Sequence, residues 1–151
     1  MTKLLSYMLR LRPSRQRARL VPIVVAGADD QDRGALLEAG DREQWDVQFT
    51  SSCEEAWTIA NTGTAPVILC DRDLADTEWR QAVRSLAALP HRPIVILVSK
   101  VADEYLWSEV FRIGGFDILA KPLRAEDIRR VVNLALSYWR SETAMAVKQS
   151  G

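Results

Sequence analysis

The chain has few of the residues that build zinc sites and disulfide frameworks. It contains two cysteines, Cys53 and Cys70, and one histidine, His91, and it has no CxxC pair. A structural zinc site of the usual Cys/His kind needs four such ligands, and the chain has only three, so the sequence excludes one. Two isolated cysteines also give no disulfide framework, which favours a reducing, cytoplasmic setting.

Long apolar runs and a net charge are missing as well. The longest fully apolar runs have about five residues, such as 94–98, far below the roughly 18 that a membrane span needs. Arg10 and Arg12 interrupt the apolar N-terminal stretch. The N-terminus therefore does not resemble a signal peptide, which needs an uninterrupted apolar region. The 20 basic and 20 acidic residues cancel, which argues against a dedicated nucleic-acid-binding protein. We expect no membrane span and no nucleic-acid partner.

The basic residues are nevertheless concentrated at one end. Residues 1–20 contain six basic residues and no acidic one. Leu4, Leu5, Met8 and Leu9 have helical spacing there, which is typical of an amphipathic arm for a membrane surface or a partner. A flexible extension or an upstream start-codon artefact is the other interpretation, and we favour it. We therefore expect a basic N-terminal extension (1–20), a folded domain (21–140) and a loose C-terminal tail (141–151).

Apolar runs alternate with helical patterns along the folded part, and 48% of the chain is apolar. The expected strands are 21–28, 45–50, 66–70, 93–98 and 116–120. The expected helices are 29–40, 51–63, 76–89, 102–115 and 124–140. Strands that alternate with helices predict an α/β domain whose parallel sheet is covered on both faces. The second strand keeps polar positions, which suits an edge of the sheet.

Charged and polar side chains follow three of the expected strands. Asp71 ends the third, Ser99 ends the fourth, and Lys121-Pro122 follows the fifth. In an open parallel sheet, function collects beyond the carboxyl ends of the strands. Taken singly, each residue is ordinary in a helix cap, a loop or a turn. Asp76 is available to cap the third helix, however, which leaves Asp71 unexplained, and together the residues predict a functional site.

This set resembles the receiver domain of bacterial two-component response regulators over about residues 21–140. The resemblance implies a flavodoxin-like, doubly wound sheet of five parallel strands in the order 2-1-3-4-5, with five helices. It also implies that Asp71 accepts a phosphoryl group as an acyl phosphate. Lys121 would pair with Asp71 and then with a phosphoryl oxygen, Ser99 would hydrogen-bond another oxygen, and the Lys121–Pro122 bond would be cis.

The resemblance also implies Mg²⁺ as a cofactor. The ion would be held by Asp71, by the backbone carbonyl of Asp73 and by acidic residues after the first strand. In the family an acidic pair directly follows that strand, but the matching positions here are Ala26 and Gly27. The sequence therefore predicts weak Mg²⁺ binding.

Acids do occur slightly later, at Asp29 and Asp30. Two interpretations stay open, because these side chains either reach the metal or only cap the first helix. Lys100 stands where the family has a small residue, and it either obstructs the acceptor or lends it positive charge. Ile118 stands at the family's aromatic switch position, so a switch would have to use Tyr105 or Trp107 instead.

The first functional hypothesis is a single-domain response regulator receiver. It is not an enzyme beyond self-phosphorylation or self-dephosphorylation. Its phosphodonor would be a sensor histidine kinase or a phosphotransfer protein. Its effector would bind the face formed by the fourth helix, fifth strand and fifth helix, and a homodimer stays open. The alternative is a pseudo-receiver, a phosphorylation-independent interaction or dimerisation module. A nucleotide-binding enzyme is disfavoured, because no glycine-rich phosphate loop follows the first strand.

Overall fold

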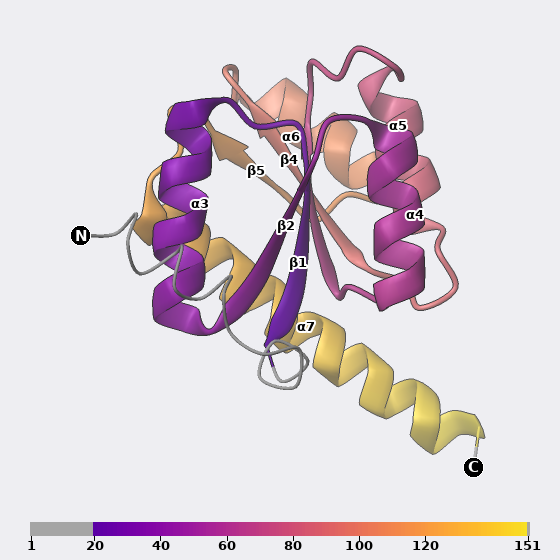
Figure 1. Ribbon diagram of the computed structural model, residues 1–151. Helices are drawn as coiled ribbons and strands as arrows, with labels where there is room; N and C mark the ends of the chain where they lie inside the picture. The colour runs from indigo at the N-terminus through magenta and orange to yellow at the C-terminus, as the bar shows by residue number, and fades with distance from the viewer. Residues whose placement is uncertain (1–19, 151) are drawn as a thin grey trace.

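A computed structural model describes residues 20–150 of the chain. Its parallel strands pair in the order β2-β1-β3-β4-β5 (Figure 1). The strands are β1 (Val21–Ala26), β2 (Trp45–Thr50), β3 (Val67–Asp71), β4 (Ile94–Ser99) and β5 (Asp117–Ala120). The helices are α3 (Asp30–Glu43), α4 (Cys53–Gly63), α5 (Trp79–Ala87), α6 (Glu104–Arg112) and α7 (Ala125–Ser150). The predicted flavodoxin-like topology is confirmed.

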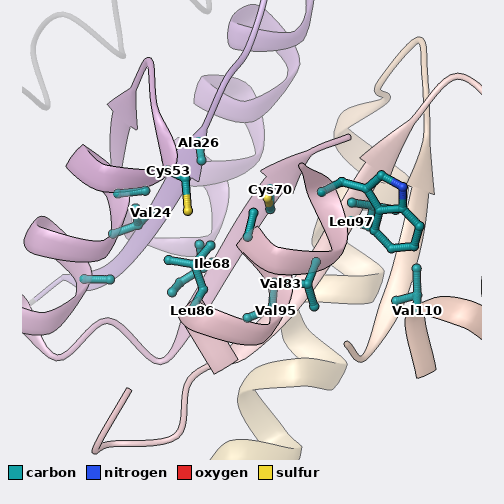
Figure 2. Packing of buried hydrophobic residues seen from close by; sticks show 14 of the residues in the cluster. Val24, Ala26, Cys53, Ile68, Cys70, Val83, Leu86, Val95, Leu97 and Val110 are labelled. Carbon is teal, nitrogen blue, oxygen red and sulfur yellow. The ribbon is translucent and has the colours of Figure 1, made fainter. Parts of the chain in front are cut away.

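The two faces of the sheet carry separate hydrophobic clusters, because successive side chains of a strand point to opposite sides. In β1, Ile23 and Val25 pack with α3 and α7, whereas Val24 and Ala26 pack with α4, α5 and α6. Figure 2 shows the cluster on the side of α4, α5 and α6, which includes Ile68, Leu86 and Val95. Burial on both faces explains why the central strands are apolar runs.

Strand β2 forms an edge, as its polar positions predicted. It pairs with β1 alone, and only Trp45 and Thr50 at its two ends are fully buried. The central strand β3 is buried at every position, including its last residue, Asp71. A charged residue therefore closes the most buried strand of the sheet.

The C-terminal helix is longer than predicted. We expected a helix to residue 140 and a loose tail at 141–151, but α7 continues to Ser150. Residues 141–149 are exposed, and Figure 1 shows this part of α7 extending away from the sheet. No glycine or proline interrupts these residues and several are good helix formers, so nothing in the local sequence stops the helix.

Gly40 does not end the first helix, contrary to our prediction. Helix α3 passes through it to Glu43, and Gln44 forms the left-handed cap with φ 62°. A Cβ at position 40 would lie only 2.8 Å from Cγ2 of Val47 on β2. Gly40 is therefore required where the helix packs closely on the sheet, and not as a stop signal.

Asp76 caps a different helix from the one we predicted. Its two carboxylate oxygens accept hydrogen bonds from the backbone N–H groups of Cys53 (3.0 Å) and Glu54 (3.3 Å), at the start of α4. These hydrogen bonds lower the pKa of Asp76. Glu78 is the N-cap of α5, whose first residue is Trp79. The loop after Asp71 is thus tied to the neighbouring helix.

The basic N-terminal extension lies almost entirely outside the described residues, so both of its interpretations stay open. Within 20–150, no helix is both long and apolar enough to cross a membrane.

Candidate functional site at the carboxyl ends of the strands

Asp71 closes β3 with both of its carboxylate oxygens engaged. The residue is 7% exposed. Its Oδ1 accepts a hydrogen bond from the backbone N–H of Asp73 at 2.8 Å, and its Oδ2 accepts one from Lys121 Nζ at 2.5 Å. The N–H of the next residue, Arg72, donates to the carbonyl of Val98 on β4. These bonds fix the carboxylate at the rim of the sheet.

Lys121 reaches Asp71 from the loop that follows β5. Its backbone N–H donates to the Ser99 carbonyl at 2.9 Å, and the Lys121–Pro122 peptide bond is cis. Burial lowers the pKa of Lys121, but the hydrogen bond and charge of Asp71 and the charges of Asp32 and Asp29 outweigh it. The net result is a raised pKa. The lysine is therefore a fixed cation at this site at neutral pH.

A third charged residue, Asp32, completes this cluster, and our sequence reasoning missed it. Asp32 lies in the first turn of α3 and is only 2% exposed. Its Oδ1 accepts a hydrogen bond from the backbone N–H of Leu123 at 3.3 Å. Its Oδ2 lies 3.8 Å from Lys121 Nζ, too long for a hydrogen bond, and has no hydrogen-bond partner. One ammonium thus faces two carboxylates.

The sequence did contain a signal for Asp32. The buried residues of α3 are Asp32, Leu36, Ala39 and Gly40, which share one face of the helix. A carboxylate that continues an apolar stripe by one turn is unusual, because charged groups are rarely buried without a partner. The position of Asp32 on the apolar face of α3 therefore indicated that its carboxylate has a cationic partner inside the protein.

The two acids that we did consider, Asp29 and Asp30, lie at the start of α3. Asp29 is the N-cap of α3, and its Oδ1 accepts a hydrogen bond from the backbone N–H of Asp32 at 2.8 Å. Asp30 is exposed in the first turn of the same helix. Asp73 contributes its backbone N–H to Asp71, while its side chain is exposed. Of the acids near β1, the structure brings Asp32 closest to Lys121.

The end of β1 carries no acid and has no room for one. Ala26 is fully buried in the cluster that α4 and α5 cover. Gly27 has φ +80°, a conformation that side chains rarely adopt. A Cβ at Gly27 would lie 3.0 Å from the Cβ of Asp71 and 3.0 Å from Cδ2 of Leu74. The backbone at this position therefore packs directly against the aspartate.

Ser99 lies on the strand next to Asp71, and its side chain has a local partner. Asp71 is paired with Val98 in the sheet register, so Ser99 is one residue closer to the rim. Ser99 is 2% exposed, and its Oγ accepts a hydrogen bond from the backbone N–H of Val101. Lys100, between them, is exposed. Ile118 on β5 is partly buried and packs against the cluster under α5 and α6.

The family model of the response regulator receiver domain matches residues 23–133. This chain belongs to that family. The match begins within β1 and ends within α7, so it covers β2 to β5 and most of the described chain.

Solved receiver structures have the same fold at low sequence identity. A two-component response regulator from Clostridium difficile superposes with a TM-score of 0.68 at 17% identity, over 78% of this chain and 96% of that one. The signal receiver domain of an HD domain-containing protein from Pseudomonas fluorescens gives a TM-score of 0.73 at 14% identity, over 83% and 93%. These similarities show the fold of the receiver alone.

One curated relative is larger. The 3',5'-cyclic-nucleotide phosphodiesterase regA of Dictyostelium discoideum is 25% identical over 126 residues, which are 80% of this chain. The matched part is 16% of the length of that protein. The similarity thus concerns a small part of the phosphodiesterase.

The site charges bear on the metal that receivers usually bind, Mg²⁺. Among residues 20–150, no three or more His, Cys, Asp or Glu side chains are grouped so that they would hold a metal ion. Two carboxylates do converge on Lys121, and the Oδ2 of Asp32 is buried without a hydrogen-bond partner. Mg²⁺ usually takes one or two carboxylates together with waters and substrate phosphate. The residues present fit a weak site whose remaining ligands are not protein side chains.

Proposed function

We propose that this receiver accepts a phosphoryl group on Asp71 and signals to a partner protein by a conformational change. The observation that supports the proposal best is the partly buried hydrogen bond between Asp71 and Lys121. These residues are 50 positions apart in sequence and close two different strands. A carboxylate held beside a fixed ammonium at the rim of a parallel sheet suits phosphoryl transfer, in which catalysis is mainly positioning and charge neutralisation.

In the proposed reaction, a carboxylate oxygen of Asp71 attacks the phosphorus of a phosphohistidine on a kinase or phosphotransfer protein. The new P–O bond forms as the P–N bond breaks, and the leaving imidazole keeps the electron pair and is protonated. Each oxygen of Asp71 has one hydrogen-bond partner, which leaves a lone pair on either oxygen for the attack. Lys121 can move to a phosphoryl oxygen without leaving the site, because a compact ammonium does not require one fixed geometry.

Two further groups have roles in this proposal. Ser99 would exchange its hydrogen bond with the N–H of Val101 for one to the phosphoryl group, which would shift the start of the β4–α6 loop. Mg²⁺, when bound, would supply positive charge that offsets the phosphoryl oxygens, and Asp71 and the backbone carbonyl of Asp73 would be among its protein ligands. The site remains a phosphoacceptor rather than an enzyme acting on a separate substrate.

We further propose that the effector binds over α6, β5 and α7. This surface carries large exposed apolar side chains. On α6, Tyr105 is 73% exposed, and Trp107 and Phe111 are exposed and stack at 5.8 Å between ring centroids. On α7, the exposed Tyr138 contacts Phe116, which precedes β5. Exposed aromatic residues are enriched in protein interfaces, which supports a protein partner there.

The pseudo-receiver remains the second candidate, and one feature favours it. Receivers with acids at the end of β1 have carboxylates for the metal there, but this chain has Ala26 and Gly27. The domain would then bind partners through the same exposed surface without phosphorylation.

Phosphodonor assays separate the two candidates. The protein is incubated with Mg²⁺ and acetyl phosphate or phosphoramidate, and its intact mass is measured. We expect a gain of one phosphoryl group, which Asp71→Asn abolishes because the amide is a poor nucleophile. Asp73→Asn is the matched control, since its side chain is exposed and only its backbone contacts Asp71. An unchanged wild-type mass with both donors would favour the pseudo-receiver.

A further inference from the structure

Asp32 is a buried carboxylate with only part of its bonding capacity used. Its Oδ1 has the Leu123 N–H, but its Oδ2 has no hydrogen-bond partner and is completely shielded from solvent. A carboxylate oxygen in such a position loses its hydration, and the loss is costly unless a cation or donor replaces the water. The nearest cation, Lys121, stands 3.8 Å away.

Lys121 does not satisfy both carboxylates equally. Its Nζ is 2.5 Å from Asp71 Oδ2 and 3.8 Å from Asp32 Oδ2. With two carboxylates and one ammonium, the cluster carries a net negative charge at neutral pH. A phosphoryl group on Asp71 adds roughly −1.5 to −2 more. Lys121 alone cannot balance that charge, so the cluster favours an additional cation.

We propose that Asp32 supplies the carboxylate that the end of β1 lacks, so that a divalent cation beside Asp71 is bound by Asp71 and Asp32 together. The proposal rests on Asp71 as the proposed phosphoacceptor, and it assigns to α3 a ligand that receivers carry at the end of β1. Asp29 and Asp30 suit this role less well, because both side chains are exposed and the Oδ1 of Asp29 caps α3.

Two consequences follow from the contacts of Asp32. The cation competes with Lys121 for the Oδ2 of Asp71, so it binds weakly until a phosphoryl group offers Lys121 a new partner. The other oxygen of Asp32 holds the N–H of Leu123, two residues after Lys121. Cation binding is therefore linked to the position of the loop between β5 and α7.

The test uses the unphosphorylated full-length protein and Mg²⁺ itself, titrated by calorimetry. Asp32→Asn removes the charge but keeps an oxygen that accepts the Leu123 N–H. We expect it to weaken Mg²⁺ binding about tenfold or more, which corresponds to about 1.4 kcal/mol. Asp30→Asn, in the same turn of α3 but exposed, is the control and should change the dissociation constant less than about twofold. Thermal melting checks that both variants fold.

Mn²⁺ provides a second readout that needs no variant. In amide NMR spectra of the wild type, low Mn²⁺ should broaden signals around Asp71, Asp32 and Leu123 first. Broadening centred on Asp29 and Asp30 that spares Leu123 would overturn the proposal. So would equal Mg²⁺ affinity of Asp32→Asn and wild type, or no detectable divalent cation binding.

These outcomes are independent of the phosphorylation assay. Phosphorylation of Asp71 with unchanged cation binding in Asp32→Asn would refute the role of Asp32 and leave the proposed function intact. Cation binding that depends on Asp32, without any phosphorylation, would refute the proposed function and leave the cation site.

Discussion

The end of β1 and the ends of β3, β4 and β5 lie at the same rim of the sheet, yet they carry different chemistry. Asp71 and Ser99 are the last residues of β3 and β4, and Lys121 directly follows β5. The end of β1 has Ala26 and Gly27 instead, one buried among apolar residues and the other packed against Asp71. The ends of β3, β4 and β5 therefore carry residues typical of a receiver, whereas the end of β1 carries only a buried apolar residue and a glycine that packs against Asp71.

The difference shows that another element of the same fold can supply an acidic side chain to this rim. Asp32 enters the site from α3, one helical turn beyond its N-cap, and lies near Lys121. The acid therefore reaches the same lysine from a helix rather than from a strand end. An end of β1 without an acid, at Ala26 and Gly27, is compatible with a charged site because α3 contributes the acidic side chain.

Returning an acid to the end of β1 should have the largest effect on stability. Ala26→Asp would bury a carboxylate among Val24, Cys53 and Cys70. We expect the free energy of unfolding to fall by about 3 kcal/mol or more, because a charge buried without a partner is costly. Urea denaturation at pH 7 measures the loss.

Ala26→Asn is the control for volume and polarity without charge. Burial raises the pKa of such an introduced carboxyl group. The aspartate variant should therefore regain part of its stability near pH 4, whereas the asparagine variant should not. A loss below about 1 kcal/mol at pH 7 would mean that the site accommodates the acid and that our contrast between the two sides of the rim is wrong.

A smaller effect is expected at Gly27. Gly27→Ala places a side chain at φ +80°, which costs about 1–3 kcal/mol. Its methyl group would also meet Asp71 and Leu74 at 3.0 Å, so phosphorylation by acetyl phosphate should slow as well. Denaturation and the rate of mass gain measure the two effects.

Gly34→Ala is the matched control, because a Cβ at that position of α3 meets nothing within 4 Å. Alanine there should leave the phosphorylation rate unchanged and stabilise the helix by about 0.5–1 kcal/mol. Equal behaviour of the two variants would show that Gly27 is not packed against the aspartate as the structure indicates.

The smallest expected effect concerns Lys100. The residue is exposed and follows the buried Ser99, so its charge is close to the site but screened by water. We predict that Lys100→Ala slows single-turnover phosphorylation a few-fold and raises the Mg²⁺ requirement, since the transition state loses a nearby cation.

Rates measured across a range of Mg²⁺ concentrations test the prediction, with Lys148→Ala on exposed α7 as the control for a general loss of charge. A faster reaction of Lys100→Ala would indicate that the lysine obstructs the acceptor. Identical rate curves would mean that it has no role in the reaction.

The sequence patterns predicted the fold correctly because the spacing of apolar residues depends on the local secondary structure and on which face is buried. Apolar strands separated by amphipathic helices indicate a buried parallel sheet, and this pattern does not depend on the conformation of the loops. The proximity of Asp71 and Lys121 was also predictable, since both follow parallel strands whose carboxyl ends share one rim. Their hydrogen bond agrees with that expectation.

Helix ends and cross-chain capping were less predictable. In the sequence Gly40 is typical of a helix end, but in the structure it lies inside α3, where the close approach of Val47 on β2 leaves little room for a side chain. Asp76 reads as a cap for the helix that follows it, yet it caps α4, which begins 23 residues earlier. Neither the role of Gly40 nor that of Asp76 can be predicted from neighbouring residues in the sequence, because both depend on contacts with other elements of the fold.

The pattern of strands and helices indicates a receiver sheet and the residues at its strand ends, because apolar periodicity and strand-end residues are local features. The identity of the acid that shares Lys121 with Asp71 depends on long-range packing instead. Asp32 is paired through Leu123, 91 residues away, and its burial follows from how α3 packs on the sheet. Side chains that share a site from a helix and a distant loop become neighbours only when both elements are in place.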